Sequence, residues 1–357
     1  MPSKPGTITL GIIGCGEVTE TFHLPSLKLL PNIEVAALSD IDKRKLDRAA
    51  ETFGINNRYE DPYELINSKE IDAVAVCTPS GNHYALGMAV LDSGKNLFME
   101  KPPALSMVEC AGLVNKARGS PLRAQVGFNL RWHRNVSKAK EIIGKGLLGK
   151  IESARSVMSV NDPELAEWRK KRALGGGSLL DLGIHHFDLL RHLLNAEAEL
   201  VHAAGVSGEV EDETTAVSVK LTNGILCSSI FSYGSGHANE IEIFGSNGIM
   251  KISLYDIAGL ELRPCDAPPG GLFTGVRRAI DRFAQTAANA GTLRHGGIFK
   301  ESYYSEWRSF ADSVIHGKDT ECGLEDGMRA LEIALAAVES ASTGIPVKLS
   351  GVGGEAE

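Results

Sequence analysis

The segment Thr7-Ile8-Thr9-Leu10-Gly11-Ile12-Ile13-Gly14-Cys15-Gly16-Glu17-Val18-Thr19 decides the fold of this chain. Residues 7–13 form an apolar run of the length expected for a buried strand. Gly14 and Gly16 follow at once, and a helical pattern continues to residue 29. Strand, glycine turn and helix in this order are typical of a dinucleotide-binding unit, because the turn N–H groups and the helix N-terminus face a pyrophosphate. Thr19 replaces the third glycine or alanine of the motif, so the glycines alone are a weak signal.

A second predicted strand, residues 34–39, ends at Asp40. Its separation from the glycine turn is that of the acidic residue that binds the adenosine ribose hydroxyls. A carboxylate there accepts hydrogen bonds from both hydroxyls and repels a 2'-phosphate, so Asp40 predicts NAD rather than NADP. The cations Lys43, Arg44 and Lys45 would soften that repulsion, which leaves NADP open. The alternative reading of Asp40 is a turn or helix-capping residue.

Strands and helices alternate through the first third of the chain. Further strands are expected at 71–78, 95–99 and 123–128, and helices at 43–53, 62–68, 106–118 and over the segment that ends near 93. This alternation predicts a doubly wound parallel sheet in an NAD(P)-binding domain over residues 1–128. Open α/β sheets bind ligands at the carboxyl ends of their strands. The expected cofactor contacts are Gly14, Gly16, Glu17, Val18, Asp40, Thr78, Pro79, His83, Glu100 and Lys101.

Lys101 follows the strand 95–99 in the segment Glu100-Lys101-Pro102-Pro103. An ammonium group beside the nicotinamide could share a proton with a reacting hydroxyl. A surface lysine in a proline turn is an equally good reading of the same residues.

The pattern changes after residue 128, and residues 129–350 predict an α+β substrate-binding and oligomerisation domain. Short alternating segments between 200 and 262 predict a mainly antiparallel open sheet with helices on one face, and Asn223-Gly224 indicates a hairpin. The exposed face reads as small and polar at Ala216, Ser218, Ser228 and Ser232, which suits solvent or a partner subunit. Helices are expected at 273–288, 302–316 and 325–343, and residues 351–357 as a disordered tail.

The chemistry is expected in the segment Gly175-Gly176-Gly177-Ser178-Leu179-Leu180-Asp181-Leu182-Gly183-Ile184-His185, which reads as a glycine loop that enters a helix. Asp181 and His185 lie four apart and would share a face. An imidazole that titrates near neutral pH beside a carboxylate suits alcohol oxidation. Two other interpretations remain open. Ser178 and Asp181 fit a capping box, and His185 could be a buried core histidine whose hydrogen bonds are made within the protein.

A basic cluster, residues 168–172, precedes the three glycines. Trp168 could stack on a sugar ring, and Arg169, together with Arg131, could hold an anionic group of the substrate. A solvated basic loop is the more ordinary interpretation of such a run.

The composition of the chain argues against several other classes of protein. The 357 residues carry a net charge of −8, which argues against general nucleic-acid binding. The six cysteines contain no C-x-x-C pair, so neither a disulfide framework nor a zinc site is indicated. No apolar run approaches the length of a membrane span, and no metal is expected. These features favour a cytoplasmic protein with a small-molecule substrate.

Over nearly its whole length the sequence resembles the glucose-fructose oxidoreductase and inositol 2-dehydrogenase family, the Gfo/Idh/MocA oxidoreductases. The resemblance rests on four motifs in order: Gly11-Ile12-Ile13-Gly14-Cys15-Gly16, Cys77-Thr78-Pro79-x-x-x-His83, Gly94-Lys95-Asn96-Leu97-Phe98-Met99-Glu100-Lys101-Pro102, and Gly175-Gly176-Gly177-x-Leu179-x-Asp181-x-Gly183-x-His185-x-x-Asp188. It implies an N-terminal Rossmann domain. Pro103 stands where the family often has a bulky hydrophobic residue, and His133 lies at a variable position.

The resemblance also implies an activity. The catalytic residues of the family fall on Lys101, Asp181 and His185, and its reaction is hydride transfer between NAD(H) or NADP(H) and a secondary alcohol of a sugar or cyclitol. Two alternatives remain: a redox-neutral enzyme that recycles bound NAD around glycoside cleavage, and a nucleotide-binding regulatory protein without catalysis. A homodimer or homotetramer formed through the open sheet is expected.

Overall fold

The computed structural model describes residues 6–265 and 282–349. The described chain forms two compact units. The N-terminal unit comprises residues 6–129, 173–175 and 303–331, and the C-terminal unit comprises 130–172, 176–265, 282–302 and 332–349. The sequence predicts a domain boundary at residue 128, and the first unit's longest segment runs to residue 129. Residues 303–331 group with this first unit.

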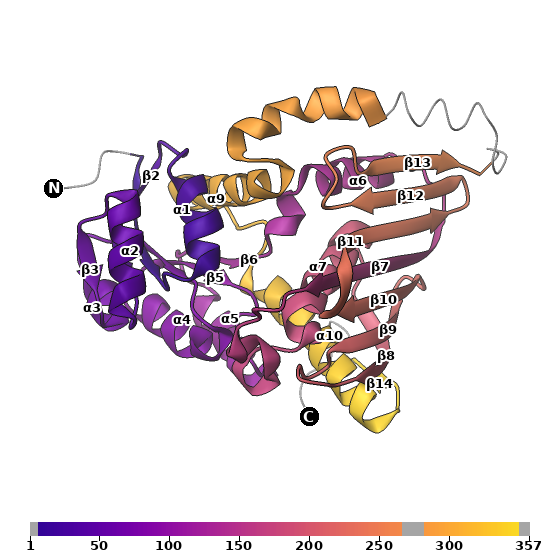
Figure 1. The fold of residues 1–357 in the computed structure, drawn as a ribbon, viewed down its shortest axis with the longest axis horizontal. Coiled ribbons are helices and arrows are strands. Elements are labelled where there is room, and N and C mark those ends of the chain that lie inside the picture. The colour runs from indigo at the N-terminus through magenta and orange to yellow at the C-terminus, as the bar shows by residue number, and fades with distance from the viewer. Residues whose placement is uncertain (1–5, 266–281, 350–357) are drawn as a thin grey trace. The chain divides into compact units, whose positions relative to one another are not determined.

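A six-stranded parallel sheet forms the centre of the N-terminal unit (Figure 1). Its order, β3-β2-β1-β4-β5-β6, is that of a Rossmann fold and confirms the predicted doubly wound sheet. The strands are β1 (Ile8–Ile13), β2 (Ile33–Ser39), β3 (Asn57–Tyr59), β4 (Ala73–Val76), β5 (Asn96–Glu100) and β6 (Ala124–Gly127). The sequence does not predict strand β3, because the strand has only three residues and they are polar. Only their pairing with β2 identifies them as a strand.

The helices of the N-terminal unit fill the connections between these strands. They are α1 (Leu24–Leu27), α2 (Lys43–Phe53), α3 (Pro62–Asn67), α4 (His83–Asp92) and α5 (Met107–Ala117). The bounds of α2 agree with the prediction, since Asp42 caps its first turn and Gly54 ends it in the left-handed region. A π-helical turn, Thr19–His23, lies immediately before α1. The sequence predicts a plain helix there.

Helix α9 (Ile298–His316) explains why the later segment belongs to the first unit. Trp307 and Phe310 are fully buried in the same hydrophobic core as β1, β2 and Phe98. The rings of Phe98 and Trp307 stack with centroids 4.0 Å apart. Burial of these large aromatic surfaces outweighs the distance along the sequence.

An eight-stranded sheet organises the C-terminal unit, in the order β13-β12-β11-β7-β10-β9-β8-β14 (Figure 1). Neighbouring strands are antiparallel except for β7 and β10, which run parallel, so the sheet is mainly antiparallel as predicted. The strands are β7 (Ile151–Asn161), β8 (Ala198–Val206), β9 (Thr214–Leu221), β10 (Leu226–Ser232), β11 (Gly234–Gly245), β12 (Gly248–Ser253), β13 (Leu260–Pro264) and β14 (Val347–Lys348).

The helices that accompany this sheet are α6 (Arg134–Gly144) and α7 (Ile184–Leu194). Helix α10 (Leu324–Thr343) begins in the first unit and ends in the second. Of the helix predicted at 273–288, residues 273–281 lie outside the described part, and residues 282–289 are helical. The predicted tail also lies outside it.

One face of the sheet is exposed along β9 and β10. Ala216, Ser218 and Ser228 are exposed as predicted, whereas Ser232 is buried, because its hydroxyl hydrogen-bonds Thr214 and the backbone N–H of Gly234. The same face is less polar than its sequence suggested. Leu226 and Ile230 on β10 and Val206 at the end of β8 are exposed apolar side chains.

Two buried histidines of the C-terminal unit make its folding sensitive to acid. Burial lowers the pKa values of His133 and His186 to about 4. Between pH 6.5 and 4 the unfolded chain therefore binds protons that the folded chain excludes, and the free energy of unfolding falls as the pH falls. Stability that is complete above pH 6.5 is lost through this window.

We expect His133→Asn to flatten this pH dependence by up to about 1.4 kcal/mol per pH unit, the contribution of one titrating group. Asparagine keeps the capping function, because His133 caps α6 by accepting the N–H of Asn135 at 3.2 Å. Urea unfolding at several pH values measures the slope. The control is His202→Asn on an exposed position of β8, and an unchanged slope in His133→Asn would contradict the assignment.

Candidate functional site

The glycine turn after β1 has the geometry of a phosphate cradle. Gly14 has φ +101°, and a Cβ there would lie 2.4 Å from the carbonyl oxygen of Cys77, so only glycine fits. Apart from Gly16 itself and its two chain neighbours, no heavy atom of the described residues lies within 4 Å of the position that a Cβ of Gly16 would take. Thr19 donates its hydroxyl to the carbonyl of Gly14 at 2.7 Å and so braces the turn from the third motif position. The open side of Gly16 suits close approach of a pyrophosphate, with exposed Glu17 and half-buried Val18 beside it.

Asp40 is held against this turn. Its Oδ2 accepts the N–H of Cys15 at 2.7 Å, and its Oδ1 accepts the N–H of Asp42 at 2.8 Å. The residue that caps α2 is Asp42, not Asp40. Burial, followed by the nearby carboxylate of Asp40, raises the pKa of the Cys15 thiol to about 12. Asp40 is thus a fixed anion at the end of β2, where a ribose is bound in Rossmann folds.

The cations that follow Asp40 have acidic neighbours of their own. Lys43 lies 3.3 Å from Glu60, and Arg44 lies 3.7 Å from Asp42. Their charge is therefore partly balanced, which leaves the negative charge of Asp40 to act on the cofactor.

His83 links two of the predicted cofactor loops. Its Nδ1 lies 2.7 Å from the carbonyl oxygen of Pro102, and its Nε2 lies 2.7 Å from that of Thr78. The ring is fully buried, and this burial lowers its pKa. Pro79 is exposed and Thr78 half-buried. A neutral imidazole carries a single N–H, so His83 donates to one of these carbonyls and lies against the other. The buried ring therefore sits between the loop after β4 and the loop after β5.

Glu100 and Lys101 stand where β5 ends. The backbone N–H of Lys101 donates to Glu100 Oε2 at 3.2 Å, and both side chains are half-buried. Gly127 on the neighbouring β6 makes room for the carboxylate, because a Cβ there would lie 2.9 Å from Glu100 Oε1. Lys101 is thus presented at the carboxyl edge of the parallel sheet.

Asp181 and His185 lie on one helical segment of the C-terminal unit. Asp181 is in a π-helical turn, Leu179–Gly183, and His185 is in the first turn of α7. The continuous α-helix of the sequence reading is wrong here, since a π turn inserts an extra residue, a feature frequent at functional sites. The capping box is wrong as well: the hydroxyl of Ser178 donates to the carbonyl of Asp212 and caps nothing. Asp181 is 5% and His185 9% exposed.

The carboxylate of Asp181 has two partners that converge on Oδ2. The phenol of Tyr233 donates to it, and Arg169 Nε lies 3.4 Å away. Burial and the Asp181 carboxylate raise the pKa of Tyr233 far above its usual value, so the phenol keeps its proton. The sequence gives no signal for Tyr233, which directly follows Ser232, the last residue of β10.

The glycines before the π turn bring Arg169 to this place. A Cβ on Gly176 would lie 2.2 Å from the carbonyl oxygen of Arg169, and the N–H of Gly177 donates to that same carbonyl at 2.8 Å. The guanidinium of Arg169 lies 5.4 Å from the ring centroid of Trp168. The basic cluster is therefore folded onto the Asp181 segment.

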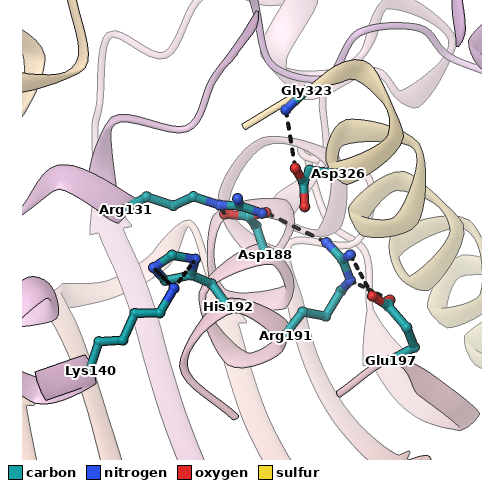
Figure 2. A network of polar contacts seen from close by, with 8 residues as sticks. All are labelled: Arg131, Lys140, Asp188, Arg191, His192, Glu197, Gly323 and Asp326. Carbon is teal, nitrogen blue, oxygen red and sulfur yellow. Dashed lines mark hydrogen bonds and ion pairs between the residues drawn. The ribbon is translucent and has the colours of Figure 1, made fainter. Parts of the chain in front are cut away.

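Arg131 lies in a buried ion network within the C-terminal unit. Its Nε and Nη2 bind the two oxygens of Asp188 at 2.7 and 2.5 Å. Figure 2 shows Asp188 between Arg131 and Arg191, and Arg191 in turn binds Glu197 at 2.6 and 2.8 Å. Asp188 is fully buried, one helical turn beyond His185 on α7. This geometry commits two donors of Arg131 to the protein, not to a substrate.

Within residues 6–265 and 282–349, no cluster of three or more histidine, cysteine, aspartate or glutamate residues could hold a metal ion. No helix in that part of the chain is long and apolar enough to cross a membrane.

Comparison with known proteins gives the site its context. The model of the oxidoreductase family with an NAD-binding Rossmann fold matches residues 8–128, and that of the C-terminal alpha/beta domain of the same family matches residues 140–349. The myo-inositol 2-dehydrogenase of Thermotoga maritima is 28% identical over 352 residues, which cover 96% of this chain and 99% of the relative. The scyllo-inositol 2-dehydrogenase (NAD(+)) of Bacillus subtilis is 26% identical over 348 residues and 96% of each chain.

A solved structure of a probable dehydrogenase from Thermotoga maritima is similar over 96% of this chain and 98% of its own, with a TM-score of 0.78 and 27% identity. Both family models match in chain order, and together they extend over most of the sequence. The chain therefore belongs to the Gfo/Idh/MocA family of oxidoreductases, and its N-terminal unit is the NAD-binding Rossmann fold of that family.

Proposed function

We propose that this protein is an NAD-dependent dehydrogenase that transfers a hydride between nicotinamide and a secondary alcohol of a cyclitol or sugar. The observation that carries the proposal is the buried Asp181 and His185 pair, on a π-bulged helix, in a chain whose Rossmann unit presents Lys101 at its carboxyl edge. The names of the relatives, both of which act on inositols, support the substrate class.

We assign the cofactor-binding site to loops of the N-terminal unit. Gly14, Gly16 and the N–H groups of Glu17 and Val18 take the pyrophosphate, and Asp40 takes the ribose hydroxyls. The loops at Thr78, Pro79 and Glu100, with the ring of His83 between them, flank the nicotinamide half. NAD supplies the hydride acceptor, and NADP is the weaker candidate because Asp40 repels a 2'-phosphate.

Three side chains divide the proton transfer. His185 takes the hydroxyl proton as the hydride leaves, and Lys101 polarises the same oxygen. Asp181 orients the imidazole and a substrate hydroxyl, and its own position is fixed by Tyr233 and Arg169. Trp168 offers an apolar ring for a sugar or cyclitol face.

Nε of Arg169 faces Asp181. In this proposal Arg169 therefore contacts the substrate only through the other N–H groups of its guanidinium. For Arg131 we propose a structural role in place of the substrate contact expected from the sequence, because Asp188 binds its guanidinium in bidentate fashion.

Two other functions remain candidates. A redox-neutral enzyme would retain NAD tightly and show no net reduction, and a regulatory protein would bind NAD without turnover. The Lys101, Asp181 and His185 set favours the dehydrogenase, since a regulatory protein has no need of it.

We further propose a cytoplasmic homo-oligomer that associates through the open sheet. Exposed Leu226, Ile230 and Val206 on β10 and β8 support an interface there, because such side chains lose contact with water on association. Light scattering after size exclusion tests the assembly, and Ile230→Asp should shift it towards monomer.

The experiment that tests the activity follows NADH absorbance while purified protein and NAD are offered cyclitols, free sugars, sugar phosphates, uronic acids and nucleotide sugars. Turnover with a cyclitol or sugar, absent in Lys101→Met, is the expected result. If no substrate gives NADH although NAD binding is measured, the dehydrogenase proposal is overturned and the other two candidate functions are favoured.

Replacing Asp40 by serine is expected to lower the ratio of kcat/KM for NAD to that for NADP by at least about tenfold, because the charge that repels a 2'-phosphate is gone. Asp40→Asn is the matched control: its amide oxygen still accepts the N–H of Cys15, so it separates charge from the hydrogen bond that braces the turn. An unchanged ratio in Asp40→Ser would show that Asp40 does not select the cofactor.

Tyr233→Phe removes the hydroxyl of Tyr233 and keeps its ring. We expect it to lower kcat/KM about tenfold, because Asp181 loses a charge-assisted hydrogen bond while the packing is kept. Steady-state kinetics with the best substrate measures the loss. Tyr255→Phe is the same chemical change in the same unit and serves as control. Wild-type kinetics in Tyr233→Phe would mean that Asp181 keeps its position without the phenol.

A further inference from the structure

A chain of hydrogen bonds leads from α9 to the backbone of Lys101 within the N-terminal unit. The indole Nε1 of Trp307 lies 3.0 Å from Nδ1 of His23, and His23 Nε2 lies 3.0 Å from Glu100 Oε1. The other oxygen, Oε2, accepts the N–H of Lys101. The proposed reaction gives no role to His23 or Trp307. Both side chains are fully buried.

The chemistry of these groups fixes the direction of the chain. An indole N–H can only donate, so Nδ1 of His23 must accept and carries no proton. The ring proton of a neutral His23 is therefore on Nε2, where it donates to the Glu100 carboxylate. Trp307 thus selects one tautomer of His23, as carboxylates and carbonyls do for metal-bound histidines.

Aromatic rings surround His23 and Trp307. The ring of His23 meets Phe98, Tyr303 and Trp307 edge-on, and Trp307 stacks on Phe98. The π-helical turn Thr19–His23, which ends at the histidine, places it directly after the dinucleotide turn.

We propose that Trp307 and His23 are positioning residues that fix the Glu100 carboxylate, and through it the Lys101 backbone, by holding His23 in its Nε2–H tautomer. Glu100 is then gripped at both oxygens, by the imidazole and by the N–H of Lys101. This inference rests on the proposed role of Lys101. It concerns the placement of the ammonium, so it affects kcat and not the affinity for the substrate.

Three substitutions separate hydrogen bonding from packing. His23→Leu removes both hydrogen bonds, and His23→Gln keeps an N–H donor that can reach Glu100 where Nε2 was. Trp307→Phe keeps a ring against Phe98 and loses only the indole donor. Phe310→Leu is the control, because Phe310 is buried in the same aromatic group and has no polar atom.

We expect kcat to fall about tenfold to hundredfold in His23→Leu and in Trp307→Phe, with KM for the substrate within about twofold. His23→Gln should recover most of kcat, and Phe310→Leu should keep it even where its Tm falls. Equal loss of kcat in Phe310→Leu, or no loss in His23→Leu, would overturn the proposal, since either result reduces the chain to packing.

Two readouts do not depend on turnover. Nitrogen-15 NMR of the NAD-bound protein should show His23 with a bare Nδ1 and a protonated Nε2, assigned by the signal that His23→Gln removes. Hydrogen exchange at the Lys101 amide should speed up in His23→Leu and Trp307→Phe. A protonated Nδ1, or unchanged exchange in both variants, would refute the positioning role. These measurements decide it even if no polyol is oxidised, which would count against the proposed function alone.

Discussion

Replacing Lys101 by methionine is expected to lower kcat about 10³-fold while NAD still binds. The change removes the ammonium and keeps a side chain of similar length at the carboxyl end of β5. A positioned proton donor typically contributes about 10² to 10⁴ in rate, so a loss of this size is that of the group itself. Steady-state kinetics gives kcat, and quenching of protein fluorescence by NADH gives the affinity for the cofactor.

The matched variant is Lys101→Arg, which keeps the positive charge. Arginine stays protonated and cannot exchange a proton with the substrate oxygen, so it should restore little of the rate. A kcat within about tenfold of wild type in Lys101→Met would remove Lys101 from the proton transfer and leave His185 as the remaining candidate. Full rescue by arginine would mean that charge suffices without proton transfer.

The fold of the N-terminal unit could be predicted almost completely, because its signals are local. Apolar runs, the Gly14 and Gly16 turn and the caps of α2 each lie within a few residues. The exceptions are the short strand β3, the π-helical turn Thr19–His23 and the place of α9. Nothing within the segment 302–316 indicates that Trp307 stacks on Phe98, since that pairing joins parts of the chain that are distant in sequence.

The candidate site divides in the same way. Lys101, Asp181 and His185 lie in recognisable motifs, whereas Tyr233, His23 and Trp307 carry no motif and are visible only through their hydrogen bonds. The π turn at Asp181 was missed because propensity and spacing do not distinguish one extra residue in a helix turn.

Arg131 shows a different limit of the sequence. A basic residue just after the domain boundary suggests a substrate contact, but in the structure Arg131 is buried and binds Asp188. Asp188 lies in the same motif as Asp181 and His185. The sequence contains both residues and gives no indication that they meet.

Replacing Asp188 by alanine is expected to lower the free energy of unfolding by about 3 to 5 kcal/mol, the usual cost of removing one partner from a buried ion pair. The side chain is fully buried between Arg131 and Arg191, so its loss leaves two guanidinium groups with less negative charge around them. Glu197 still partners Arg191, and the greater part of the cost should come from Arg131. The urea midpoint at pH 7 measures the change.

A double-mutant cycle shows where the cost arises. Arg131→Met with Asp188→Leu replaces the pair by apolar groups of similar size, and we expect it to be more stable than either single variant, because no unpaired charge remains buried. A loss below about 1 kcal/mol in Asp188→Ala would mean that water or another group replaces the carboxylate. Because Asp188 lies one turn beyond His185 on α7, kinetics of the stable double variant adds a second result. If kcat is retained there, the network stabilises the unit without aligning His185; if kcat falls, the ion pair also orients the part of α7 that carries His185.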